Sequence, residues 1–328
     1  MRELALAAFA AETGVHAVSE PRDARYARFL DRFDERAFKE RLSAAGIRWL
    51  GRSDPAFPSG LQPLFDPPPG LFLRGSADPA LLNRPAVAIV GARACSAYGS
   101  HVARTFGREL AGAGLVVVSG MARGVDGEAH RGALESGGTT VAVLGCGIDR
   151  DYPAAHGELA RRIGANGLIV SEYPPGVEPA PWRFPARNRI IAGLAQATVV
   201  VEARERSGAL ITADLALEEG REVFAIPGEI TSALSAGANG LLRLGAIAAT
   251  SAADVLESFG LRQPDPVPPT LSPPAERALA RLAQSPASAD QLARALDLDA
   301  GSVAAALAEL ELHELLTENS GIFRAAAR

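Results

Sequence analysis

Six short runs of apolar residues constrain the fold of this chain more than any other feature of its sequence. Each run has the length of a strand, and most are followed by a glycine-containing turn and a segment of helical periodicity. Because the runs lack the alternation of a half-exposed strand, they predict strands buried on both faces. The expected strands are 86–90, 116–118, 140–144, 168–170, 198–201 and 223–226, and the expected helices are 99–113, 125–135, 186–195 and 210–219.

This pattern predicts an α/β fold with a Rossmann-like, doubly wound parallel sheet across residues 46–262. Residues 1–45 place apolar residues among charged ones at helical spacing, which predicts a small N-terminal helical module. Residues 263–274 are rich in proline and predict a stiff linker. Residues 275–328 show three helical segments and a short hairpin around 319–321, the pattern of a winged-helix domain.

Composition excludes several classes of protein. Among 328 residues Lys39 is the one lysine, and it lies in neither a phosphate-binding loop nor a Schiff-base context. Cys95 and Cys146 lack the spacing of a zinc site, so we expect no metal and no cofactor. No apolar run approaches the roughly 18 residues of a membrane span, and Glu3 stands where a secretory signal would be positive. We therefore expect no membrane partner.

Three of the turns after strands carry groups that suit a phosphate. Free backbone N–H groups at the start of a helix and a nearby guanidinium both attract anions. The GxGxxG turn of dinucleotide enzymes and their ribose-binding acid are absent, which indicates a larger ligand than a dinucleotide cofactor. The candidate binding residues in these turns are Gly91, Arg93, Ser96, Gly120, Arg123, Gly124, Ser207 and Gly208.

The stretch from Trp182 to Arg189 is the sharpest local signal, and we expect it to end a long loop. It interleaves aromatic rings with arginines, although aromatic residues form only 5% of the chain. Flat rings stack on unpaired bases while guanidinium groups neutralise their phosphates. This stretch therefore adds Arg183, Phe184, Arg187, Asn188 and Arg189 to the candidate nucleic-acid-binding residues.

The pattern around one histidine, His130, makes it a candidate general base. His130 follows Asp126 by four residues in a predicted helix, so the two side chains share a face and can pair. A histidine without a nucleophile nearby is more often a structural hydrogen-bonding group. We therefore expect no catalytic residue here.

Short motifs occur along the chain in a fixed order. They are Gly91-Ala92-Arg93, Ser119-Gly120, Gly124-Val125-Asp126, Ala129-His130, Ser171-Glu172-Tyr173-Pro174, Phe184-Pro185, Arg187-Asn188-Arg189-Ile190-Ile191-Ala192-Gly193, Ser207-Gly208, Ile211-Thr212-Ala213, Gly237, Asn239-Gly240 and Gly245-Ala246. Together they resemble the DNA processing protein A (DprA/Smf) family over about residues 45–260. That resemblance implies a cytoplasmic bacterial protein that binds single-stranded DNA, has no enzymatic activity, protects incoming DNA in natural transformation and loads RecA. It also implies a homodimer built through the Rossmann-like domain.

A short segment after Asn239 is the candidate dimer interface. It crowds Leu241, Leu242 and Leu244 into four positions, and a role for these leucines in the protein core is equally open.

Two other functions stay open. The chain is similar in its glycine turns to the cytokinin-activating phosphoribohydrolases, which hydrolyse nucleoside monophosphates, but it lacks their PGGxGT turn and acidic pattern. The winged helix suggests a regulator that binds duplex DNA. Its candidate recognition helix at 299–312 has no Arg or Lys and carries Asp299, Glu309 and Glu311, so we expect it not to enter the major groove.

Overall fold

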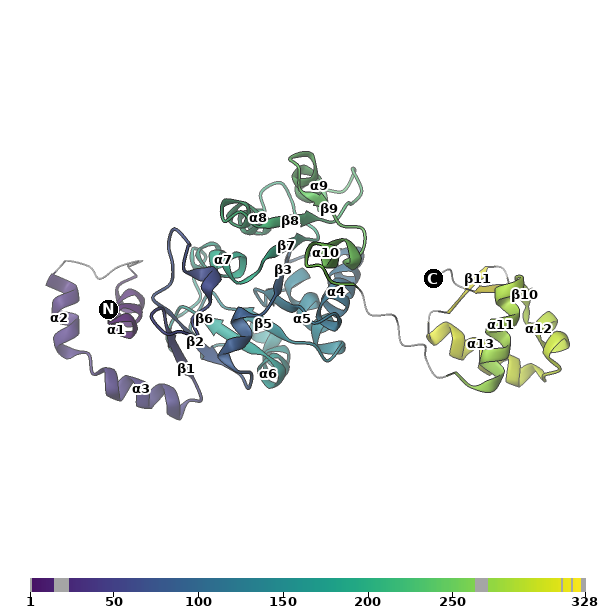
Figure 1. The fold of residues 1–328 in the computed structure, drawn as a ribbon, viewed down its shortest axis with the longest axis horizontal. Coiled ribbons are helices and arrows are strands. Elements are labelled where there is room, and N and C mark those ends of the chain that lie inside the picture. Colours follow the sequence, from purple (N-terminus) through teal and green to yellow (C-terminus); the bar gives the residue numbers. More distant parts are fainter. Residues whose placement is uncertain (1, 15–23, 263–270, 314, 320, 326–328) are drawn as a thin grey trace. The chain divides into compact units, whose positions relative to one another are not determined.

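In the computed structural model of the protein, the apolar runs form the middle of one sheet (Figure 1). The structure describes residues 2–14, 24–262, 271–313, 315–319 and 321–325. The six central strands are parallel and lie in the order β6-β5-β4-β3-β7-β8, which confirms the doubly wound sheet. They are β3 (Ala86–Val90), β4 (Val116–Ser119), β5 (Thr140–Val143), β6 (Leu168–Ser171), β7 (Ala197–Val200) and β8 (Glu222–Ala225).

Three strands at the edges extend this sheet. β2 (Gly70–Arg74) pairs antiparallel with β6, and β1 (Arg48–Gly51) pairs antiparallel with β2. β9 (Ile247–Ala248) adds to β8 in parallel at the opposite edge. The sheet is therefore mixed at its β1 edge, whereas the sequence predicted a parallel sheet.

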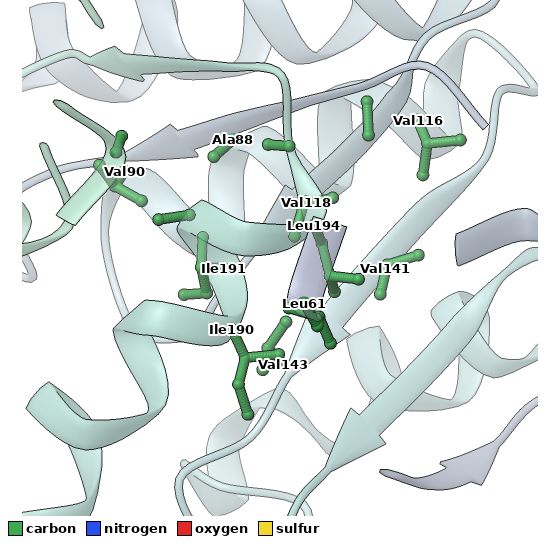
Figure 2. Packing of buried hydrophobic residues seen from close by; sticks show 14 of the residues in the cluster. Leu61, Ala88, Val90, Val116, Val118, Val141, Val143, Ile190, Ile191 and Leu194 are labelled. Atoms are coloured by element: carbon green, nitrogen blue, oxygen red, sulfur yellow. The ribbon is translucent and has the colours of Figure 1, made fainter. Parts of the chain in front are cut away.

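Helices cover both faces of the sheet, as strands without polar alternation require. Along β3, Ala88 and Val90 face one hydrophobic cluster while Val87 and Ile89 face another. Figure 2 shows the first cluster, in which Ile190 and neighbouring residues of α7 pack among valines from the strands. That face is covered by α7 (Arg183–Leu194), α8 (Gly208–Glu218) and α9 (Ala236–Arg243), and the other by α4 (Ala97–Gly112), α5 (Val125–Glu135) and α10 (Ala252–Ser258).

Helices α4 and α5 approach each other closely enough for their backbones to touch. A Cβ atom on Gly107 of α4 would stand 2.3 Å from the carbonyl oxygen of Ala129 in α5. A Cβ atom on Gly132 of α5 would stand 2.0 Å from the carbonyl oxygen of Arg104 in α4. Both distances are far below van der Waals contact, so only glycine allows the two helices to sit this close.

The N-terminal helices form the predicted module and join the sheet through buried contacts. Phe9 meets Tyr26 and Phe29 edge to face, with ring centroids 5.1 and 5.4 Å apart. Glu3 accepts hydrogen bonds from the Ser53 backbone N–H and hydroxyl, which ties the module to the segment after β1. The helices are α1 (Glu3–Thr13), α2 (Ala24–Arg32) and α3 (Glu35–Ala44), and α6 (Gly157–Asn166) packs farther along the same face of the sheet.

The chain divides into two compact units, Met1–Pro264 and Asp265–Arg328. The second is the predicted winged helix, with a sheet in the order β10-β12-β11. Residues 263–270 of the predicted linker and Ser320 of the predicted hairpin turn lie outside the described residues. The elements are α11 (Pro273–Gln284), α12 (Ala289–Leu296), α13 (Ala300–Leu312), β10 (Ala287–Ser288), β11 (Leu316–Asn319) and β12 (Ile322–Ala325).

Helix α11 begins at Pro273, two residues before the predicted start of the winged helix at residue 275. Ser272 caps it by accepting a hydrogen bond from the Ala275 N–H, and Pro273 occupies the first helical position, where its missing N–H costs nothing. Within the described part of the chain, no helix combines the length and the apolar character that crossing a bilayer requires.

Candidate nucleic-acid interface

The site lies where the strand order reverses, between the carboxyl ends of β3 and β7. Successive strands from β3 lead to one edge of the sheet, and those from β7 lead to the other. This reversal separates the loops after the two strands and opens a crevice for ligands. The crevice contains a cavity of about 460 Å³, which we call the switch-point cavity. Its walls include Gly91 after β3 and Gly208 at the start of α8.

A second cavity of about 450 Å³, here called the Cys146 cavity, lies beside the first over the ends of β4 and β5. Arg93, Phe184 and Arg187 line both cavities. The structure thus gathers most of the residues that the sequence predicted from separate turns. The predicted residues that line one or both cavities are Gly91, Arg93, Gly120, Arg123, Phe184, Arg187, Asn188, Ser207 and Gly208.

Phe184 and Tyr152 line both cavities, and we call this pair of rings the aromatic wall. The ring of Phe184 stacks on Tyr152, with centroids 5.3 Å apart and planes at 27°. The Arg93 guanidinium carbon lies 5.0 Å from the Phe184 centroid, in cation–π contact. Tyr152 was not among the predicted site residues, because it comes from the loop between β5 and α6 and only the fold brings it to Phe184.

Phe184 belongs to the first turn of α7, which begins at Arg183, and not to a loop. The sequence prediction of a loop through Arg189 is therefore wrong, whereas the helix expected at 186–195 is confirmed and begins three residues earlier. Pro185 favoured the loop prediction, because proline usually interrupts a helix. In the first turn of a helix proline is tolerated, since the N–H groups there have no partner within the helix.

Arg187 is 4% exposed and forms part of the floor of both cavities. Its Nη1 donates to the carbonyl oxygens of Gly120, at 2.9 Å, and Val143, and its Nε donates to Asn188 Oδ1 at 3.2 Å. Its Nη2 donates to no group among the described residues. Burial lowers the pKa of Arg187 to about 10, against the opposing effect of Asp126.

Asp126 is the acidic counterpart of Arg187 in the switch-point cavity. It is 7% exposed, and its Oδ2 accepts a hydrogen bond of 3.3 Å from the Ala122 N–H. Burial raises the pKa of Asp126, while Arg187 and Arg93 act in the opposite direction. The switch-point cavity is therefore lined by a buried carboxyl group and a buried guanidinium that interact electrostatically.

Arg189 lines neither cavity, although the sequence assigned it to nucleic acid. Its Nη1 and Nη2 donate to the two carboxylate oxygens of Glu172 at 2.8 and 2.7 Å, and its Nε donates to the carbonyl oxygen of Asp66 at 2.7 Å. Burial alone would lower the pKa of Arg189, but the two carboxylates raise it above its ordinary value. Arg189 therefore fastens α7 to the end of β6, outside the cavities.

Ser96 and Gly124 also lie outside the two cavities and shape the turns beside them. Ser96 caps α4 by accepting from the Gly99 N–H at 3.0 Å, and its own hydroxyl donates to Glu202 at 2.6 Å. Gly124 has φ of +72°, and a Cβ atom there would stand 2.3 Å from the Ala92 carbonyl oxygen. These two residues position the turns that carry the exposed Arg93 and Arg123.

His130 does not pair with Asp126, so that prediction is wrong. Its Nδ1 lies 2.7 Å from the Thr140 hydroxyl, which itself donates to the Val117 carbonyl oxygen at 2.6 Å. The hydroxyl must therefore accept from the histidine. Burial lowers the pKa of His130 to about 3, so the ring is neutral and has a structural role.

The three leucines of the candidate dimer interface do not share one surface. Leu241 is 6% exposed and belongs to the hydrophobic core, so an interface role for its side chain is wrong. Leu242 is half-buried against the same core. Leu244 is 87% exposed, and Ile247 in the edge strand β9 is 44% exposed.

The sequence matches two families whose ranges together cover the α/β unit and the winged helix. Residues 48–260 match DNA recombination-mediator protein A, and residues 262–321 match the DprA winged helix domain. Every residue that lines the two cavities falls within the first match.

Curated relatives share this region. DNA processing protein DprA of Streptococcus pneumoniae is 48% identical over 206 residues, which are 63% of this chain and 72% of the relative. A putative DNA processing protein DprA of Mycobacterium tuberculosis is 53% identical over 175 residues, which are 53% of this chain but 45% of the relative.

Two solved structures agree with the fold. The X-ray structure of DNA processing protein A from S. pneumoniae has a TM-score of 0.66 and 42% identity, covering 72% of this chain and 82% of that one. A structure describing the single-stranded DNA binding mode of DNA processing protein A from Helicobacter pylori has a TM-score of 0.59 and 32% identity, covering 65% and 95%.

Proposed function

Because the chain belongs to the DNA recombination-mediator protein A family, we propose that it binds single-stranded DNA at the two cavities and has no catalytic role. The observation that carries this proposal is the aromatic wall of Phe184 and Tyr152 with the Arg93 guanidinium against it. A ring and a cation in contact match the two parts of an unpaired nucleotide, its base and its phosphate. The H. pylori relative of known structure, described as binding single-stranded DNA, supports the same ligand.

The cavities suggest how one nucleotide would be held. A base replaces the Arg93 guanidinium over the Phe184 ring, and this cation then turns to the adjacent phosphate. The turn from Gly91 to Arg93 and the N-terminus of α8 at Gly208 offer further positive potential for phosphates. Nothing in this arrangement selects one base, because every base has a face that stacks, so we expect little sequence preference.

The biological role follows from the family as an inference. We infer that the protein protects incoming single strands during natural transformation and loads RecA onto them in the cytoplasm. The family's description as a recombination mediator supports this role.

We also propose a homodimer, with the exposed Leu244 and the neighbouring edge strand β9 at its interface. Leu244 and Ile247 expose apolar surface, and the outer edge of β9, which pairs with no strand in the described residues, supports an association between copies. Two protomers would present two binding sites to one strand and raise avidity for long strands over short ones. Light scattering should show a dimer at micromolar concentration and a monomer for Leu244→Glu. A wild-type monomer would exclude the dimer.

The function is tested by comparing ligands on the full chain. Fluorescence anisotropy with labelled single-stranded and duplex oligonucleotides of the same length should show preference for the single strand. Equal or stronger binding of the duplex would instead favour a regulator that acts through the winged helix. Incubation with AMP should release no ribose 5-phosphate, and its release would favour a phosphoribohydrolase.

A further inference from the structure

A second aromatic group stands just outside the cavities, at the start of α7. The Arg183 guanidinium carbon lies 4.7 Å from the Trp182 ring centroid and 5.1 Å from that of Tyr173. Nη1 of Arg183 donates to the carbonyl oxygen of Glu178. Since Tyr173 is 8% exposed, these contacts anchor the guanidinium, and with it the Trp182 ring, to the protein surface. We call Trp182, Arg183 and Tyr173 the rim platform.

The rim platform has one exposed member and an excess of positive charge. Trp182 is 49% exposed, an unusual position for the largest aromatic side chain. Within the described part of the chain, Arg183 forms no ion pair, and the first turn of α7 contains no acidic residue. The platform therefore offers an aromatic surface beside a cation that has no ion-pair partner among the described residues.

The position of the platform along the chain connects it with the aromatic wall. Pro181, directly before Trp182, lines the switch-point cavity, and Phe184 two residues later forms the wall. Trp182 is itself the N-cap residue of α7 and lines neither cavity. A strand with one base at Phe184 thus has another aromatic surface within reach as it leaves the cavity.

We propose that Trp182 is a second base-stacking site, which takes an unpaired nucleotide adjoining the one held at Phe184. Arg183 faces the phosphate of that nucleotide while it holds the indole in place. This inference rests on the proposed binding of single-stranded DNA and extends it, because it assigns part of the affinity to nucleotides outside the cavities. Its signature is a dependence of that affinity on strand length.

The chain contains two tryptophans, which allows a direct spectroscopic test. Trp49 packs on Phe72 with ring centroids 4.6 Å apart, so Trp49→Phe keeps a ring there and leaves Trp182 as the sole indole. Unlabelled oligothymidylates should quench its emission, with saturation at the concentrations at which anisotropy reports binding. Thymidine monophosphate, which is too short to span both aromatic sites, should leave the emission unchanged if it binds at Phe184.

Affinity measurements with Trp182→Ala and Trp182→Phe test the same site independently of fluorescence. For oligothymidylates of 3 to 15 nucleotides, Trp182→Ala should weaken binding about five-fold or more at the longer lengths, since a stacked base contributes roughly 1–3 kcal/mol. The loss should shrink toward the shortest oligonucleotide, and Trp182→Phe should restore most of the affinity. A thermal melt of each variant confirms that it is folded.

The outcomes separate the two hypotheses. If the wild-type protein binds no single-stranded oligonucleotide, the proposed function itself fails and this inference fails with it. If the wild type binds but Trp182 emission does not change, or Trp182→Ala binds every length as the wild type does, the inference alone is overturned. An altered mass of Trp182→Ala in light scattering, with normal DNA binding, would assign the indole to a protein contact instead.

Discussion

The arginines around α7 fall into two groups that the sequence does not distinguish. Arg187 and Arg189 are 4% and 7% exposed, and backbone carbonyls or carboxylates occupy most of their donors. Arg93 and Arg123, from the turns after β3 and β4, are exposed and line the cavities. Arg187 also lines both cavities and Arg189 lies outside them, but both are held by the protein itself, whereas the second group is available to a ligand. Location in the fold, more than the number of arginines, decides which of them are available to the proposed DNA ligand.

The largest effect should come from the buried group. Arg189→Ala leaves Glu172, itself 7% exposed, without its bidentate partner, and breaking such a buried pair costs about 3–5 kcal/mol of unfolding free energy. Urea denaturation should show this as a lower midpoint. The double variant Arg189→Met with Glu172→Gln removes both charges and should recover part of the loss. A stable Arg189→Ala protein with weakened DNA binding would reverse the assignment of the two groups.

The second-largest effect should come from substitutions in the aromatic wall of Phe184 and Tyr152. Phe184→Ala should weaken single-stranded DNA binding by about 1–3 kcal/mol, the contribution of one stacked base, while Phe184→Tyr keeps the ring and most of the affinity. Anisotropy titrations measure both variants. Because Phe184 is half-buried beside Tyr152, a melting curve should accompany them to show that the fold is intact.

Substitution of an exposed arginine should change the salt dependence of DNA binding more than it changes the affinity at one salt concentration. Arg93→Ala should flatten the slope of log K against log salt by about 0.7, the share of one phosphate on a single strand. Arg93→Lys retains the charge and should retain the slope. If neither Phe184→Ala nor Arg93→Ala changes binding, the DNA path lies away from the two cavities.

The smallest effect on single-strand affinity should come from removing the winged helix, whose arginines are far from the cavity residues in the sequence. Deleting residues 270–328 removes the winged helix, whose helix α13 contains no Arg or Lys and whose Glu309 accepts from Ser272. Single-strand affinity should stay within about threefold, below the roughly 1.4 kcal/mol of a tenfold change. Duplex binding by the isolated tail, tighter than the non-specific range of about 10⁻⁴ to 10⁻⁶ M at physiological salt, would contradict this expectation.

The central strands were predictable because burial on both faces leaves a local mark, an unbroken apolar run such as 86–90. The edge strands leave no such mark. β1, with Arg48 and Trp49, is only partly buried, and β9 has two residues, so each is defined by the neighbour it pairs with. Local sequence patterns do not contain that information.

In the candidate site too, residues in local patterns were predictable from the sequence, whereas their distant partners were not. Arg93 and Phe184 were found because a turn after a strand and an aromatic-arginine stretch are local patterns. The partners that set their surroundings come from distant parts of the chain: Glu202 reaches Ser96 across 106 positions, and Glu172 reaches Arg189 across 17. Sequence reasoning identified the arginines of this region, but only their partners reveal which ones are free.

The glycine contacts between α4 and α5 have a consequence for how the site moves. With Gly107 against Ala129 and Gly132 against Arg104, the backbones of the two helices are in contact, and we expect the helices to move as one block. The turn with Arg93 leads into α4 and the turn with Arg123 leads into α5, so we expect both turns to move with that block. Adjustment to the proposed DNA ligand should then come from the start of α7 and from the loop that carries Tyr152.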